Sequence, residues 1–463
     1  MKERIVISIM CCVLICLGLF NAQAGPTGRK QETINTSRNN TTVAEERFKV
    51  SKDENGRLTF VSVLEKDLLE ETNNMKLHAM SACMIDAKTG RVLFGKNHME
   101  PRAMASTTKI LTCLVALENC SLDETVTASE YAASMPDVQL NMSAGEQFRL
   151  YDLLLSLMLE SHNDTAVAIA EHVGGSVDAF CKMMTERAGK IGCNTSVFLT
   201  PNGLDKEIET ETGLIKHSTT ATELALIMRE CLKNEQFVSI CRTQNAMISN
   251  LAKSKSYQLS NHNALLDIMQ GALVGKTGFT CDAGYCYVGA VERGNNVYIC
   301  SLLGCGWPNN KNYKWQDMKT LIDFADEAYE CLSLDDIPLN NQLYDEIFVT
   351  DALVEGEPNG FVPLEVNMSA ETDSSVLVMR EGEVVSVLYE FPQSLCAPVE
   401  SGDIVGNIYY TINGQTFKKE NLTVKNTIHK LTLKDMLYLV LNKFCYRDST
   451  SSDSSASSEK CES

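Results

Sequence analysis

The sequence predicts an α/β chain of the α+β kind, in which a helical block is inserted into an antiparallel sheet and a smaller all-β domain follows. Strand-like runs lie at both ends of the segment 76–332, and apolar residues at helical spacing fill its middle. Beyond residue 335 the pattern changes to short strands separated by Gly, Asn and Pro turns. A chain of 463 residues is long enough for two or three domains of about 100–200 residues each.

The sheet of the first domain is expected to combine strands that are distant in the sequence. Residues 82–85 and 91–94 flank a turn that contains Gly90, which is typical of two strands joined by a turn. Residues 283–291 and 296–303 flank a polar turn and predict a hairpin. Apolar periodicity predicts five helices between the two pairs and one after them, at residues 106–119, 150–159, 166–173, 177–191, 220–232 and 314–332.

The remaining residues predict a second domain and two polar ends. Residues 25–75 are assigned to a leader and linker, because their first half is rich in Asn, Thr and Arg and has little to bury. Residues 335–425 predict the all-β domain. Residues 430–447 predict an amphipathic helix, and the Ser-rich acidic tail 448–463 is expected to be disordered. The expected strands of the all-β domain are 347–349, 375–379, 384–389 and 403–410.

The first 24 residues predict export from the cytoplasm. Lys2 and Arg4 precede an apolar run at 5–20, and the small residues Ala22 and Ala24 frame a cleavage site. This is the pattern of a signal peptide, and it makes the mature protein extracytoplasmic. The alternative is an uncleaved anchor, but the run is shorter than the ~20 residues that a spanning helix needs.

Charge and cysteine content exclude some classes of partner. The chain has 41 Lys and Arg residues against 60 Asp and Glu, a net charge of −19, whereas nucleic-acid binding needs a basic surface. The 18 cysteines include neither a CxxC pair nor a Cys/His cluster at zinc spacing. We therefore expect no nucleic-acid partner, no metal site and no cofactor.

A Ser-x-x-Lys motif, Ser106 to Lys109, stands at the start of the first predicted helix. Three residues are nearly one helical turn, so the Lys109 side chain returns beside Ser106. A hydroxyl becomes a good nucleophile only when a base takes its proton, and a lysine can be that base only if its pKa falls. Alone the motif is weak, because a helix-capping serine and a solvated lysine give the same pattern.

Two further motifs follow in a fixed order. Ser161-His162-Asn163 comes after the predicted helix 150–159, where a loop would expose polar side chains. Lys276-Thr277-Gly278 follows an apolar run and suits an edge strand that faces a cleft. The order S-x-x-K, S-x-N, K-T-G is the signature of class A β-lactamases and penicillin-binding proteins.

With these motifs, the region 78–332 resembles the low-molecular-weight penicillin-binding proteins of the D-alanyl-D-alanine carboxypeptidase family. The flanking sequences are also similar to that family, and they are residues 105–110 (ASTTKI), 200–205 (TPNGLD), 276–280 (KTGFT), 283–285 (AGY) and 395–399 (LCAPV). The last of these matches the C-terminal β-domain of the family. The resemblance implies a transpeptidase/β-lactamase-like fold and a cell-wall enzyme of the bacterial envelope.

The resemblance also implies a role for each site residue. Ser106 would attack the carbonyl between two terminal D-alanines, Lys109 would accept its proton, and Ser161 would protonate the departing amine. The backbone N–H groups of Ser106 and Phe279 would hold the oxyanion. The residues that would bind substrate are Asn163, Lys276, Thr277, Gly278, Phe279 and Lys314. Four positions depart from the family pattern: Met104 stands where Pro often does, His162 is larger than usual, Gly275 stands one place later than expected, and Lys314 replaces an Arg.

The resulting hypothesis is an exported serine carboxypeptidase that trims peptidoglycan pentapeptides through an acyl-enzyme and is acylated by β-lactam antibiotics. A class A β-lactamase would need an E-x-x-L-N string between Ser161 and Lys276, and none occurs there. Transpeptidase or endopeptidase activity, and an inactive wall-binding scaffold, remain alternatives. The helix at 430–447 is expected to lie at the membrane surface, with a cap on the β-domain as the alternative.

Overall fold

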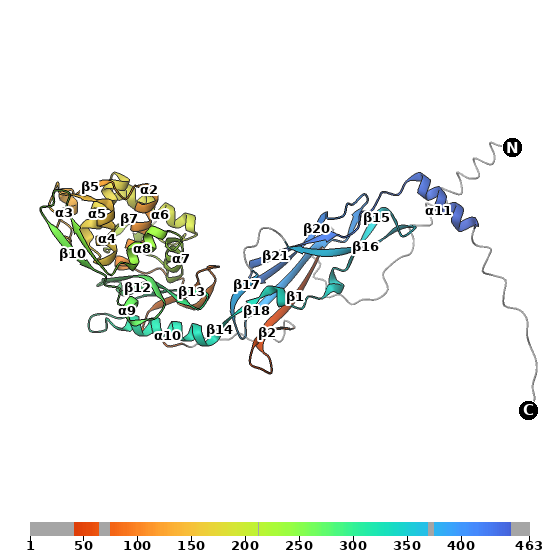
Figure 1. The fold of residues 1–463 in the computed structure, drawn as a ribbon, viewed down its shortest axis with the longest axis horizontal. Coiled ribbons are helices and arrows are strands. Elements are labelled where there is room, and N and C mark those ends of the chain that lie inside the picture. Colours follow the sequence, from red (N-terminus) through yellow and green to blue (C-terminus); the bar gives the residue numbers. More distant parts are fainter. Residues whose placement is uncertain (1–40, 64–74, 212, 369–374, 446–463) are drawn as a thin grey trace, which may run out of the picture.

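The computed structural model describes residues 41–63, 75–211, 213–368 and 375–445. The predicted signal peptide, residues 25–40 of the predicted leader and the Ser-rich tail lie outside these residues. Figure 1 shows two bodies side by side, one that contains most of the helices and one built of long strands.

The first body is organised around a five-stranded antiparallel sheet in the order β11-β12-β13-β3-β4. Two of its strands precede the helices in the sequence and three follow them, as the alternation of apolar runs predicts. The strands are β3 (Ser81–Asp86), β4 (Val92–Lys96), β11 (Ala272–Thr280), β12 (Gly284–Arg293) and β13 (Asn296–Leu303). This sheet with its inserted helices confirms the predicted α+β fold of the first domain.

The helical block covers one face of this sheet, and α10 covers the other (Figure 1). Its central helices are almost entirely apolar where they meet, so α2, α4 and α5 share one large core. The helices are α2 (Lys109–Asn119), α3 (Glu130–Ala133), α4 (Leu150–Leu159), α5 (Asn163–Gly174), α6 (Val177–Ile191), α7 (Ala221–Cys231), α8 (Glu235–Arg242), α9 (Leu265–Ile268) and α10 (Tyr313–Ala328).

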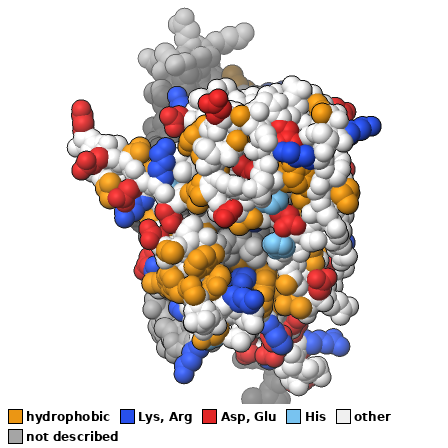
Figure 2. Space-filling view, turned by 90° about the vertical axis from the view of Figure 1, so that its left-hand side faces the viewer, with side chains coloured by type: hydrophobic (Ala, Val, Ile, Leu, Met, Phe, Trp, Pro, Cys, Tyr) orange, Lys and Arg blue, Asp and Glu red, His pale blue; other side chains and the backbone are white. Residues whose placement is uncertain are grey.

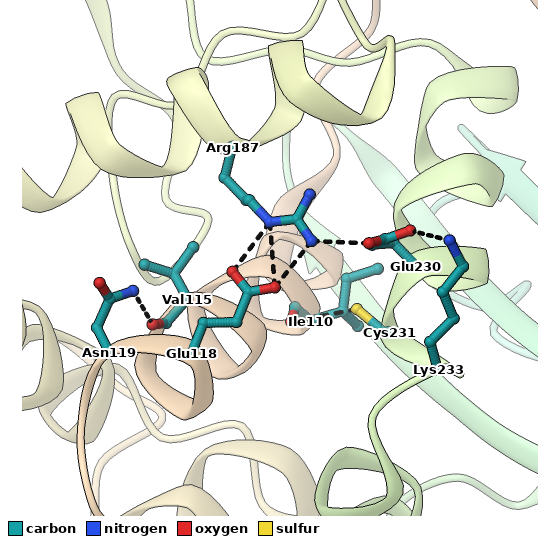
Figure 3. A network of polar contacts seen from close by, with 8 residues as sticks. All are labelled: Ile110, Val115, Glu118, Asn119, Arg187, Glu230, Cys231 and Lys233. Carbon is teal, nitrogen blue, oxygen red and sulfur yellow. Dashed lines mark hydrogen bonds and ion pairs between the residues drawn. The ribbon is translucent and has the colours of Figure 1, made fainter.

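A network of charged side chains fixes the far end of α2 against two other helices (Figure 3). Arg187 on α6 donates three hydrogen bonds to Glu118 on α2, at 3.1, 2.9 and 2.8 Å, and one to Glu230 on α7 at 2.8 Å. Lys233 adds an ion pair to Glu230 at 2.7 Å. The planar guanidinium binds two carboxylates at once, so it sets the orientation of all three helices.

The second body is an eight-stranded sheet with its own apolar core. The strands, in spatial order, are β19 (Ser394–Cys396), β15 (Glu346–Val354), β16 (Glu357–Met368), β21 (Gln415–Val424), β20 (Ile404–Ile412), β18 (Val384–Pro392), β1 (Thr41–Lys52) and β2 (Leu58–Ser62). All its neighbouring strands are antiparallel except β15 and β19, which are parallel. The all-β character predicted for the C-terminal region is confirmed.

The assignment of residues 25–75 to a leader and linker is partly wrong. Within residues 41–62, β1 and β2 form, and both belong to this second sheet. β1 pairs with β18 over nine residues, and Phe48 and Val50 are buried in the core. The alternation of buried and exposed residues along β1 is the pattern of a half-buried strand. This strand could not be predicted from the local sequence, because its pairing partner lies more than 300 residues further along the chain.

The predicted helix 314–332 is also too long. Helix α10 ends at Ala328, and Tyr329–Ser333 forms the strand β14, which pairs with β17 (Val376–Arg380). Two further hairpins were not predicted: β7 (Glu207–Thr210) with β8 (Gly213–Lys216), and β9 (Asn245–Ser249) with β10 (Ser256–Ser260). The short pair β5 (Thr125–Thr127) and β6 (Gln147–Arg149) completes the first domain.

The two domains are joined by a buried ion pair as well as by β14 and β17. Arg91, before β4, binds Glu383, before β18, at 2.6 Å and also donates to the Val378 carbonyl. The Arg91 side chain is 6% exposed and that of Glu383 is 14% exposed. Tyr329 Oη adds a hydrogen bond of 2.5 Å to the Leu93 carbonyl.

Helix α11 (Leu433–Cys445) is the last element, and it projects beyond the strand domain (Figure 1). Several of its apolar residues are exposed: Leu433 is 74% exposed, Leu437 49% and Leu441 60%. Among the described residues, no helix has both the length and the apolar character needed to cross a bilayer.

Glu383→Ala should destabilise the protein by about 3 kcal/mol, because it leaves the buried Arg91 guanidinium without its carboxylate. Glu381 lies two residues away and makes a long, exposed ion pair with Lys52, at 3.7 Å. Glu381→Ala should therefore cost less than about 1 kcal/mol. Urea unfolding of both variants measures the difference. Equal losses would show that the Arg91 pair does not hold the domains together.

Candidate active site

The predicted nucleophile and base lie within hydrogen-bonding distance. Residues Ala105–Thr108 form a 3-10 turn, and α2 begins at Lys109. This turn places Lys109 Nζ 2.8 Å from Ser106 Oγ. Ser106 is partly exposed, whereas the Lys109 side chain is fully buried beneath it. The first turn is tighter than the α-helical turn that the motif predicts, but the two side chains still meet.

Two further groups accept hydrogen bonds from Lys109. Its Nζ donates to Asn163 Oδ1 at 2.9 Å and to the Asn202 carbonyl at 2.6 Å. Burial lowers the pKa of Lys109 well below its usual value, and the nearby positive charge of Lys276 lowers it further, against an opposite effect of Asp164. A lysine whose pKa is lowered gives up its proton more readily, so it can then accept one from Ser106.

The Ser161-His162-Asn163 motif connects α4 to α5. Asn163, the first residue of α5, is 5% exposed and is held by hydrogen bonds of 3.1 Å from its Nδ2 to the Pro136 and Asp137 carbonyls. This differs from the expectation of an exposed loop, since the Asn163 amide is enclosed and aimed at Lys109. The His162 ring is hydrogen-bonded to Ser156 on α4, with 2.8 Å between Nδ1 and Oγ.

The Lys276-Thr277-Gly278 motif lies on β11, which is an edge strand of the sheet as predicted. Lys276 Nζ donates to Ser161 Oγ at 2.8 Å. Burial lowers the pKa of Lys276 to about 8. The strand therefore links the second and third motifs directly, and Lys276 also influences the first through its charge.

Two glycines allow the backbone to approach Ser106 closely. A Cβ on Gly278 would lie 2.9 Å from the Ser106 nitrogen and 3.0 Å from Ala105 Cβ. A Cβ on Gly203 would lie 2.0 Å from the Ala105 carbonyl oxygen, and Gly203 also has a φ of +86°. Only glycine permits both contacts, so β11 and the loop at 200–205 lie directly against the turn that carries Ser106.

Phe279 follows Gly278 on β11, and Lys314 lies in the first turn of α10. Phe279 is 38% exposed, and its ring lies 4.7 Å from that of Tyr285 on β12. Lys314 Nζ lies over the Tyr285 ring at 4.9 Å and over Trp315 at 4.7 Å, and it donates to the Lys311 carbonyl. Burial lowers the pKa of Lys314. Lys314 is thus connected to Phe279 through Tyr285.

Three contributors near Ser106 were not identified from the sequence. The Asn202 carbonyl accepts from Lys109, but a backbone group leaves no side-chain signal. His217 is buried, its Nδ1 accepts from the Leu199 N–H at 3.0 Å, and its Nε2 lies 2.8 Å from Thr108 Oγ1. Asp164 accepts from the Leu140 N–H at 2.9 Å, which fixes the segment before α4 against α5.

Figure 2 shows the end of the molecule formed by the first domain, where acidic and basic side chains are interspersed with hydrophobic ones. The groups around Ser106 act through short-range contacts. Together they supply a nucleophile, a base of lowered pKa, and hydroxyl, amide and ammonium groups around it. This is the set of groups that acyl transfer requires.

Comparisons with known proteins agree with this geometry. The profile of the D-alanyl-D-alanine carboxypeptidase family matches residues 69–305, more than half of the chain, and that of the penicillin-binding protein 5 C-terminal domain matches residues 354–430. The two domains define a penicillin-binding protein of the low-molecular-weight type. The chain belongs to the D-alanyl-D-alanine carboxypeptidase family. It is a serine-type carboxypeptidase, a hydrolase.

Individual relatives cover most of the sequence. The chain is 28% identical over 381 residues to D-alanyl-D-alanine carboxypeptidase DacF of Bacillus subtilis, covering 81% of this chain and 92% of that protein. It is 30% identical over 248 residues to DacB2 of Mycobacterium tuberculosis, covering 53% and 82%. The crystal structure of DacD from Francisella tularensis has the same fold, with a TM-score of 0.57, 23% identity and coverage of 79% and 97%.

Gly203→Ala should slow the release of D-alanine from a peptide ending in two D-alanines by about 100-fold, because the new methyl group displaces the turn that carries Ser106. The matched control is Gly192→Ala, at a φ of +99° with nothing within 4 Å of its Cβ. It carries a similar backbone strain without the clash, and it should keep the wild-type rate. Equal activity of the two variants would exclude the steric argument.

Proposed function

We propose that Ser106 is the nucleophile of an acyl-enzyme mechanism that removes the terminal D-alanine from peptidoglycan pentapeptides. The observation that carries this proposal is the 2.8 Å hydrogen bond between Lys109 Nζ and Ser106 Oγ, made by a lysine that is fully buried. A buried lysine whose pKa is lowered is a base at the right distance to activate a hydroxyl.

In the first half-reaction, Ser106 Oγ forms a bond to the carbonyl carbon while its proton passes to Lys109. Charge then develops on the carbonyl oxygen. The close approach of β11 at Gly278 supports the Ser106 and Phe279 N–H groups as its donors. Collapse of this intermediate breaks the peptide C–N bond and leaves the acyl group on Ser106.

Ser161 and Lys276 are assigned to the leaving group and the substrate carboxylate. The departing D-alanine amine takes the proton that Lys109 accepted, passed on through Ser161, whose hydroxyl is hydrogen-bonded to Lys276 at 2.8 Å. Protonated Lys276 and the Thr277 hydroxyl bind the terminal carboxylate, and Asn163 orients the peptide. Water then attacks the ester and gives a proton to Lys109. The C–O bond to Ser106 breaks, Lys109 returns the proton to Ser106 Oγ, and the shortened peptide leaves.

Lys314 is assigned a supporting role in carboxylate binding. Its ammonium packs on Tyr285, next to Phe279, and it supplies a point charge instead of the two-pronged contact of an arginine. A β-lactam would acylate Ser106 by the same first step and stall before hydrolysis. Transpeptidase or endopeptidase activity differs only in the acyl donor or acceptor, and it remains the second candidate.

We further propose that the protein is exported and binds the membrane surface through α11. The exposed residues Leu433, Leu437 and Leu441 give this helix an apolar side that nothing in the described chain covers. Lys430 and Lys434 lie at its start and can meet anionic headgroups. The exposed stripe favours the lipid interface over a cap on the β-domain.

Ser106→Ala should abolish both covalent labelling by a fluorescent penicillin and release of D-alanine from a synthetic pentapeptide. It removes one partly exposed hydroxyl, so thermal unfolding should remain within about 1 °C of the wild type. Mass spectrometry of the intact protein locates the adduct. A mutant that is still acylated at the wild-type rate would place the nucleophile elsewhere.

The products separate the alternatives. Free D-alanine and a tetrapeptide indicate a carboxypeptidase, whereas cleavage of a cross-linked dimer without D-alanine release indicates an endopeptidase. An unlabelled, inactive wild-type protein would indicate a scaffold. Turnover of the β-lactam without a lasting adduct would indicate a β-lactamase.

The double variant Leu437→Glu, Leu441→Glu should lose binding to anionic phospholipid vesicles, because it places two carboxylates on the apolar side of α11. Flotation of the mature protein with vesicles measures this. Ile404→Glu is the matched control, since Ile404 is 61% exposed on β20, outside α11, and it should bind as the wild type does. If the double variant floats with the vesicles as well as the control, α11 does not bind the membrane.

A further inference from the structure

A cysteine, a carboxylate and a histidine come together at the end of the helical block away from Ser106. The ligand atoms of Cys120, Glu124 and His172 all lie within 4.8 Å of one another. Cys120 follows the last residue of α2, Glu124 precedes β5, and His172 is in the last turn of α5. All three side chains are neither fully buried nor fully exposed.

We propose that Cys120, Glu124 and His172 bind a divalent transition-metal ion of the zinc type, with a water molecule as the fourth ligand. A thiolate, an imidazole and a carboxylate are the three ligand types that zinc accepts. At bond lengths of about 2.0–2.3 Å, the ligand atoms of a tetrahedral site are roughly 3.3–3.7 Å apart. The three side chains therefore need only small rotations to close around an ion.

The segment that supplies two of the ligands is held in place before any ion binds. Glu124 Oε1 accepts from the Ser121 N–H at 2.6 Å, and Oε2 lies 2.9 Å from His172 Nε2. The backbone is also fixed, because the Leu150 N–H donates to the Glu124 carbonyl at 2.9 Å. A pre-formed set of ligands lowers the entropy cost of binding.

Charge and access also favour an ion. A thiolate and a carboxylate carry two negative charges, which a divalent cation neutralises, so the occupied site is electrically neutral. His172 also lines a surface hollow of about 640 Å³ bordered by Thr125, Ser129 and Glu171. The hollow leaves His172 accessible from solvent.

The ion would stabilise the folded protein and would take no part in the reaction at Ser106. The first residues of α2 and α5 are Lys109 and Asn163, whose side chains are hydrogen-bonded to each other, and the metal ligands lie near the opposite ends of the same two helices. Eleven residues of helix separate Lys109 from Cys120 by about 16 Å. A metal ion at Cys120 would tie these two helices together at a second point.

No metal site was expected from the sequence, because Glu124 and His172 are 48 residues apart and no short motif contains the three ligands. Only the packing of α5 against β5 and the end of α2 brings them together.

The test uses the full mature protein after treatment with a chelator, titrated with Co²⁺, and then with Zn²⁺. We expect one equivalent of Co²⁺ to give a thiolate-to-cobalt absorption band and the visible bands of a tetrahedral ion, both removed by Zn²⁺. Cys120→Ser should lose the thiolate band, and His172→Gln should weaken Co²⁺ binding at least tenfold. Binding should tighten as pH rises, because burial and the Glu124 carboxylate raise the pKa of the Cys120 thiol.

Two variants control for other thiols and for a simple ion pair. Cys331→Ser removes an exposed cysteine elsewhere, and His262→Gln removes a histidine that bonds Glu160 at 3.1 Å. Both should bind Co²⁺ as the wild type does. Zn²⁺ should also raise the unfolding temperature of the wild type and both controls, and not that of Cys120→Ser, whose unfolding in chelator should match the wild type. A thiolate band that survives in Cys120→Ser, or its absence from the wild type, would overturn the proposal.

Discussion

The burial of the Lys109 ammonium is the constraint on which the site depends. A charged amine removed from water is costly unless it is paired or loses its proton. Here three oxygen atoms, from Ser106, Asn163 and Asn202, receive its N–H groups, and each comes from a different segment of the chain. The same burial lowers the pKa of Lys109. Burial of this amine therefore opposes folding, and it also makes the lysine a useful base.

The domain architecture delivers these three segments to one point. The sheet presents β11 at its edge, where Gly278 lets the strand approach the turn before α2. The helical core fixes α2 and α5, and the Arg187 network secures the far end of α2 (Figure 3). The hydrogen bond from Lys276 to Ser161 then connects the sheet to the helices across the site. No single motif supplies all the groups that acyl transfer requires. The fold brings the three motifs into hydrogen-bonding contact, and this contact makes the chemistry possible.

Much of the fold could be predicted because the signals are local. Helices α4 and α6 have the bounds that apolar periodicity predicts, and the β12–β13 hairpin follows from its polar turn. The three motifs were also identified from the sequence, since each is contiguous. What could not be predicted depends on distant contacts. β1 is stable as a strand only when β18 is beside it, and β14 extends because β17 is there to pair with it. The role of the Asn202 carbonyl rests on backbone position, which no side chain reports.

The pairing of β1 with β18 has a consequence for how the chain is assembled. Glu46 on β1 accepts a hydrogen bond from Tyr389 on β18 at 2.5 Å, although the two residues are 343 positions apart. The helical domain is thus an insertion within the strand domain, which is built from chain on both sides of it. Synthesis proceeds from the N-terminus to the C-terminus, so the helical domain can fold before the second domain is complete. β1 and β2 can join their sheet only after β18 has been synthesised. A protein cut short before β18 would therefore carry two unpaired strand edges, and such edges are what quality control and aggregation both recognise.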